Sequence, residues 1–170
     1  MDRLSKEILK ELLPTEKEAV PRPQSKQALR RHHLGQLDHW SPAILLERAA
    51  YLRKLAKQGD GSASETLREY PRHCTMLLFR SRNCVVEVHE NFADLFYVLE
   101  GRATLVTGGM VAGAKTIAPG EMRGVSIEGG SSQELRAGDV AHVPAGLPHQ
   151  MLVSGDKTVT CLVVKIQENA

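Results

Sequence analysis

Three side chains that commonly bind divalent metals fall in two widely separated stretches of this sequence. His89 and Asp94 lie in the stretch VEVHENFAD, and His149 follows a Pro-Ala-Gly-Leu-Pro segment near the end of the chain. Two imidazoles and a carboxylate that converge can hold a divalent ion and leave coordination positions open for water or a substrate. We therefore predict a metal site made of His89, Asp94 and His149. The donor types suit iron, manganese, nickel or zinc and do not select one of them.

A fourth ligand is expected beside His89, and two residues qualify. Glu87, His89 and Asn91 alternate along the sequence, so on a strand they would share one face. Either Asn91 or Glu87 could complete the set, and the spacing does not decide between them.

Further polar residues are candidates for catalysis. Glu87 and His142 are candidate acid–base groups, and Arg123 could anchor a substrate carboxylate. His142 lies on an expected strand two residues before Pro144, where it would face either the interior or the surface.

The residues around His149 predict two strands joined by a tight connection. Gly138-Asp139 is a turn pair, 140–143 is an apolar run of strand length, and Pro144-Ala145-Gly146 forms a loop before a second strand begins near His149. This connection would fix the direction of the histidine.

Other short apolar runs predict a β-rich domain. Residues 94–99 and 103–107 read as a hairpin about Glu100-Gly101, and residues 110–132 read as a long connection with some strands and a flap. On the strand before Gly101, Phe96 and Val98 would share the inward face of Asp94. The remaining expected strands are 75–79, 84–89 and 158–166.

The first part of the chain predicts helices. Residues 5–13 form a short amphipathic pattern, and Ser41-Pro42 begins a stronger helix that ends before Gly59. Either this helix or another subunit could cover Tyr97 and Leu99. A further helical turn is expected over 64–70. The predicted organisation is a helical N-terminal extension over 1–70 and a β domain over 71–170.

Composition limits the partners. The net charge is only +2, and the basic segment 21–33 contains no aromatic residue to stack on a base, so nucleic acid is an unlikely partner. The N-terminus has no apolar signal core and no stretch is long enough to span a membrane, which predicts a soluble cytoplasmic protein. The three cysteines show no CxxC spacing and are expected to be reduced.

The spacing of Gly138, Pro144, Gly146 and His149 resembles the second motif of the cupin superfamily. The segment Tyr97-Val98-Leu99-Glu100-Gly101, with Asp94 ahead of it, resembles the end of the first motif. The resemblance implies an all-β antiparallel jelly-roll barrel whose interior holds a metal, with His149 as a ligand. It also implies a homodimer formed through sheet surfaces.

Two functional hypotheses follow from the predicted site. The first is a metal-dependent enzyme acting on a small organic molecule, in which the ion polarises a carbonyl or enolate-forming oxygen or binds dioxygen. The second is a non-catalytic cupin that binds or senses a small molecule, with or without a metal.

Overall fold

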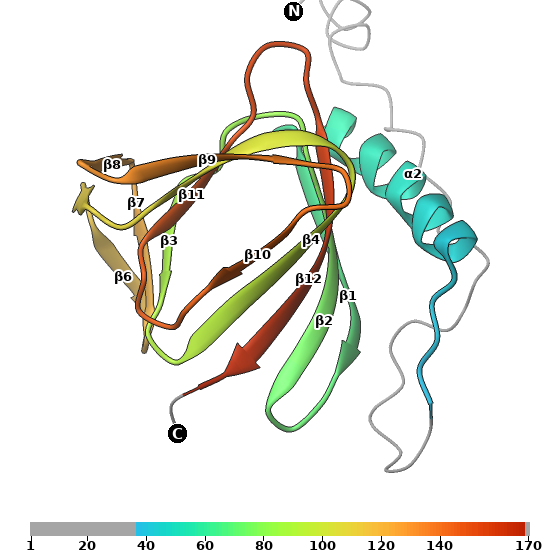
Figure 1. The fold of residues 1–170 in the computed structure, drawn as a ribbon, viewed down its shortest axis with the longest axis horizontal. Helices are drawn as coiled ribbons and strands as arrows, with labels where there is room; N and C mark the ends of the chain where they lie inside the picture. Colours follow the sequence, from blue (N-terminus) through green and yellow to red (C-terminus); the bar gives the residue numbers. More distant parts are fainter. Residues whose placement is uncertain (1–36, 169–170) are drawn as a thin grey trace, which may run out of the picture.

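The computed structural model describes residues 37–168 as one helix followed by twelve strands (Figure 1). The expected helix over 5–13 and the basic segment 21–33 lie outside the described residues. The elements are α2 (Pro42–Gln58), β1 (Ser62–Glu69), β2 (His73–Arg80), β3 (Val86–His89), β4 (Phe92–Thr107), β5 (Met110–Ala112), β6 (Lys115–Ala118), β7 (Glu121–Gly124), β8 (Ser126–Glu128), β9 (Ser131–Arg136), β10 (Val140–Val143), β11 (His149–Leu152) and β12 (Val159–Gln167).

The antiparallel strands curl into a jelly-roll barrel around β4, which confirms the predicted fold class. The strand order β1-β2-β12-β4-β11-β3-β7-β6 runs around the barrel, and β9 and β10 also pair with β4. The first half of β4 pairs with β10 and β12, and its second half pairs with β9 and β11. Strand β4 therefore belongs to two sheets of the barrel, one with β1, β2, β10 and β12 and the other with β3, β6, β7, β9 and β11.

The hairpin predicted about Glu100-Gly101 is wrong, because β4 continues through these residues. Gly101 has φ +78°, and a Cβ at this position would lie 1.9 Å from the carbonyl oxygen of Thr158. The pairing with β12 also shifts register here, between Thr160 and Cys161. The glycine thus bends the strand from one sheet into the other instead of reversing it.

The helix α2 covers the outer face of the sheet beside β1 and β2 (Figure 1). Its start follows the prediction, because Pro42 is the first helical residue and the Ser41 hydroxyl accepts a hydrogen bond from the Ile44 amide at 3.4 Å. Leu99 packs against the cluster under the helix, whereas Tyr97 remains 41% exposed. The buried members of this cluster are Leu45, Ala49, Leu52, Ala56, Leu67, Leu77 and Phe79.

The helical turn predicted over 64–70 is wrong, because these residues belong largely to strand β1. This strand pairs antiparallel with β2 and places Leu67 under α2. Helix propensity of a Ser-Glu-Thr-Leu-Arg-Glu run is a weak preference, and pairing with an exposed sheet edge together with burial of Leu67 overrides it.

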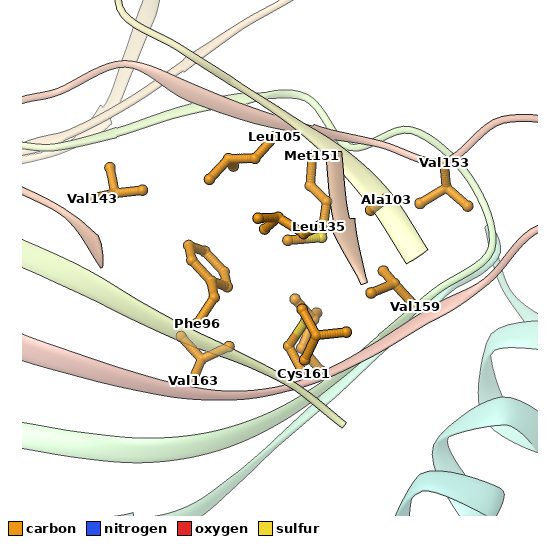
Figure 2. Packing of buried hydrophobic residues seen from close by; sticks show 12 residues of the cluster. Phe96, Ala103, Leu105, Leu135, Val143, Met151, Val153, Val159, Cys161 and Val163 are labelled. Atoms are coloured by element: carbon orange, nitrogen blue, oxygen red, sulfur yellow. The ribbon is translucent and has the colours of Figure 1, made fainter. Parts of the chain in front are cut away.

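An apolar cluster fills the barrel interior next to the long strand (Figure 2). Phe96 and Val98 are 4% and 0% exposed, as their predicted inward direction requires. Met151 and Val153 of the β11 region also belong to this cluster. Because side chains alternate along a strand, the inward-facing residues of β4 include core residues and residues of the site described below.

The 110–132 segment is more ordered than a flap. It forms β5 to β8, in which β5 pairs with β8 and β7 pairs with both β3 and β6. Arg123 consequently lies on β7 and not on a loop. No helix within residues 37–168 combines the length and apolar character needed to cross a bilayer.

Candidate metal centre

Three strands bring His89, Asp94 and His149 together inside the barrel. His89 ends β3, His149 begins β11, and Asp94 lies near the start of β4. Strand β11 pairs with β3 so that His149 is opposite Glu87. The two imidazole rings lie 5.4 Å apart between centroids, and all three of these side chains are at most 4% exposed.

A carboxylate behind the ring fixes the tautomer of His89. Its Nδ1 lies 2.7 Å from Oε2 of Glu121. Burial lowers the pKa of His89, as does the charge of Lys165, although the carboxylates of Asp94 and Glu121 oppose this change. A neutral ring that donates from Nδ1 to Glu121 carries its lone pair on Nε2, which faces Asp94.

A backbone carbonyl plays the same part for His149. Its Nδ1 lies 3.2 Å from the carbonyl oxygen of Leu147. A carbonyl oxygen only accepts hydrogen bonds, so Nδ1 carries the proton and Nε2 presents a lone pair. The short Pro144–Pro148 connection before β11 thus supplies the group that orients the ring.

Both Nε2 atoms are buried and lack a hydrogen-bond partner among the described residues. Each lies 3.5 Å from the same atom, Oδ2 of Asp94. Buried polar atoms without partners are rare and costly in native proteins. Two imidazole lone pairs and a carboxylate oxygen around one point form a donor set that suits a divalent transition metal.

The second oxygen of Asp94 is held from the opposite side. Nζ of Lys165 on β12 lies 2.7 Å from Oδ1. Burial opposes ionisation of Asp94, but the charge and hydrogen bond of Lys165 lower the pKa of this carboxyl. Asp94 is therefore an ionised carboxylate with one oxygen for Lys165 and one directed at the histidines.

Glu87 also reaches this group. Glu87, His89 and His149 each offer a ligand atom, and these atoms all lie within 4.8 Å of one another. Asn91, the alternative fourth ligand, lies exposed between β3 and β4 with its side chain near Gly120. The structure therefore brings Glu87 to the histidines and leaves Asn91 outside the cluster.

Two arginines flank Glu87. Arg123 Nη2 lies 3.5 Å from one carboxylate oxygen of Glu87, and Arg80 Nη2 lies 3.7 Å from the other. Arg123 also donates through Nη1 to Glu121 at 3.1 Å. The predicted anchor residue thus lies beside the histidine cluster, next to a second arginine from β2.

His142 lies away from the cluster. It is opposite Leu95 in the β10–β4 pairing, is 48% exposed and has Nε2 3.7 Å from Glu168. Asp94 and Leu95 point to opposite sides of β4, so a residue beside Leu95 faces outward. The structure therefore does not bring this candidate acid–base group to the others.

A cavity of about 240 Å³ adjoins the polar cluster. Met76, Leu78, Phe96 and Val163 form its apolar wall, and the polar wall contains the charged residues described above. A cavity with an apolar wall and a few convergent polar groups is typical of small-molecule sites. Its size suits a small organic ligand.

Sequence reasoning missed three residues of this site: Glu121, Lys165 and Arg80. Each had a weak signal. Lys165 is a charged residue in an otherwise apolar run and shares the parity of Cys161 and Val163, which both point inward. Glu121 and Arg123 alternate on β7, but the glycine-rich sequence around them suggested a loop.

Residues 69–170 match the family model described as "Cupin". No curated protein matches the chain. Solved structures with a similar fold include a conserved double-stranded β-helix protein from Klebsiella pneumoniae, with 19% identity over 64% of this chain and 79% of that one and a TM-score of 0.48. TT1209 from Thermus thermophilus has 22% identity over 68% and 93% of the two chains, with a TM-score of 0.49. The polyketide cyclase RemF from Streptomyces resistomycificus has 18% identity over 65% and 72%, with a TM-score of 0.45. The match to the family model covers more than half of the chain, so the chain belongs to the cupin family.

Proposed function

We propose that this cupin is a metal-dependent enzyme that acts on a small organic molecule. The observation that supports this most directly is the pair of buried Nε2 atoms of His89 and His149, which lack partners among the described residues and face one oxygen of Asp94. In the proposal these two nitrogens and Oδ2 of Asp94 hold a divalent ion, and Glu87 completes the set. Bound there, the ion would polarise a carbonyl or enolate-forming oxygen of a substrate.

The protein's own residues would prepare the site in four ways. Glu121 and the Leu147 carbonyl hold the rings in the tautomers that expose Nε2. Lys165 keeps Asp94 ionised. The apolar wall of the cavity excludes water around the reacting group, which strengthens the electrostatic interactions there. Arg123 is the proposed anchor for a substrate carboxylate.

Metal analysis of the purified protein tests the first step. After expression in medium supplemented with iron, manganese, nickel and zinc, we expect about one equivalent of a transition metal per chain. The His149→Ala variant should lose most of it, since the proposed set of four donors would lose the one that β11 contributes. Less than about a tenth of an equivalent in folded wild-type protein would refute the metal-dependent function.

The Lys165–Asp94 contact supports a second candidate, a ligand-binding cupin without metal. Lys165 already neutralises Asp94, whose Oδ2 lies 3.5 Å from both histidines. In that case the cavity would bind a small molecule with the histidines as hydrogen-bonding groups. The metal analysis would then find no metal in a protein that still binds its ligand. Homodimer formation and a cytoplasmic location remain predictions.

A further inference from the structure

The carboxylate of Glu87 lies near two sets of possible partners, a pair of arginines and a pair of histidines. Its carboxylate lies between Arg80 and Arg123, and it also lies within reach of the His89 and His149 nitrogens. The contacts to the arginines are 3.7 and 3.5 Å, longer than the 2.7 to 3.2 Å of a good N–H···O hydrogen bond. The two guanidinium groups therefore hold this carboxylate only loosely.

Arg80 in particular has unused hydrogen-bonding capacity. Nη1 donates to the Ser62 hydroxyl at 3.2 Å, and Nη2 makes the long contact with Glu87. Nε is buried and has no partner within residues 37–168. The Nε–Nη2 edge of a guanidinium group matches the two oxygens of a carboxylate. Arg80 therefore lines the cavity with an edge that Glu87 does not satisfy, and its Nε is buried behind the long Glu87 contact.

A metal at the histidines would change these contacts. Coordination brings a carboxylate oxygen to about 2.0 to 2.2 Å from the ion. Each carboxylate oxygen of Glu87 contacts one of the two arginines, so an oxygen that bound the ion would do so in competition with Arg80 or Arg123. Arg123 would keep Glu121 through Nη1 while its Nη2 becomes free.

The charges of the cavity wall also favour an anionic ligand once a metal is bound. Arg80, Arg123 and Lys165 face three carboxylates, those of Glu87, Asp94 and Glu121. With neutral histidines these charges cancel, so a divalent ion would leave the cavity with an excess of two positive charges. A carboxylate ligand would cancel one of these two charges.

We propose that Glu87 exchanges partners, so that metal binding frees Arg80 and Arg123 to bind the carboxylate of a small organic acid. This inference rests on the proposed metal site and names the substrate class: a short carboxylate whose other end reaches the histidines. Glu87 occupies the position of the substrate carboxylate until metal arrives. Metal and acid then bind cooperatively, and by linkage each raises the affinity for the other by the same factor.

Propionate is a suitable probe, with propionamide as its neutral analogue, and its dissociation constant can be followed by NMR titration of the Arg Nε–H signals. In wild-type protein, Zn²⁺ should lower the propionate dissociation constant about tenfold. In metal-free protein, Glu87→Gln should produce a similar gain, because a neutral amide no longer competes for the arginines. Propionamide should show neither gain.

Control variants assign the gain to the two arginines. Arg80→Gln and Arg123→Gln should each remove most of it, whereas Arg102→Gln should not, because Arg102 is 53% exposed and pairs with Glu134 away from the cavity. If the gain persists without Arg80 and Arg123, the ion itself binds the probe and the proposal is wrong.

The Zn²⁺ experiment on wild-type protein and the Glu87→Gln experiment on metal-free protein distinguish this proposal from the proposed metal-dependent function. If wild-type protein binds no Zn²⁺ but Glu87→Gln gains propionate affinity, the metal function fails while the carboxylate position stands. If Zn²⁺ binds and propionate affinity does not change, the partner exchange is wrong and the metal site stands. Should Glu87→Gln not fold, the Zn²⁺ arm in wild-type protein still decides.

Discussion

The barrel interior has a polar region and an apolar region that are built from the same strands. On β4, Asp94 belongs to the polar region and Val98 to the apolar one; on β12, Lys165 and Cys161 divide in the same way. In the apolar region (Figure 2) the buried side chains contact one another. In the polar region, buried nitrogens of His89 and His149 lack partners among residues 37–168.

This difference separates stability from function within one fold. Close packing of apolar side chains stabilises a domain, and each removed group costs free energy. Buried polar groups without partners reduce stability unless a ligand satisfies them. We infer that packing in the apolar region offsets the stability lost in the polar region, and the following substitutions test that division.

The largest expected effect is a loss of stability from the apolar region. Leu105→Ala removes a 4% exposed side chain from the cluster and should lower the free energy of unfolding by about 2 to 5 kcal/mol, measured by urea denaturation. Leu46→Ala, at a 44% exposed position on α2, is the matched control and should change it by less than about 0.5 kcal/mol. The folded Leu105→Ala protein should keep its metal affinity; a parallel loss of both would mean that the two regions are not separable.

The next effect concerns metal affinity. Glu121→Ala removes the carboxylate that orients His89 and should weaken Zn²⁺ binding by about 10- to 100-fold in a competition titration with a chelator. Glu134→Ala, which changes an exposed carboxylate on β9, should leave it unchanged. Equal Zn²⁺ affinity in Glu121→Ala and wild type would contradict the orienting role of Glu121.

The smallest effect is the pH dependence of the apolar region. Burial raises the pKa of Cys161 from 9.0 to about 12. Between these values the unfolded chain loses the thiol proton and the folded protein keeps it, so stability falls as pH rises above about 9. Between pH 8 and 10 the wild type should lose about 1 kcal/mol more than Cys161→Ala in denaturant titrations. An identical pH profile for both would show that this thiol is not sealed from water.

The sequence predicted the fold and the convergence of His89, Asp94 and His149 because these depend on local spacing. The turn glycine and prolines before His149 and the alternation around Asp94 are short-range patterns, and the β10–β11 and β4 geometry follows them. The helix at Ser41-Pro42 was equally local.

What the sequence did not predict depends on contacts between distant strands. Lys165 reaches Asp94 only because β12 pairs with β4, and Arg80 reaches Glu87 across the barrel from β2. The helical pattern over 64–70 became a strand because β2 offered an edge, and Gly101 bends β4 because β12 packs against it. The sequence of 64–70 and the residues beside Gly101 do not by themselves reveal the strands that pair with them.

The shared strand β4 also limits how a ligand can leave. Because one unbroken segment, bent at Gly101, is hydrogen-bonded into both walls, the walls cannot hinge apart without breaking that ladder. We expect ligand exchange to proceed by rotation of side chains around the cavity, and such rotations are faster than collective backbone motions.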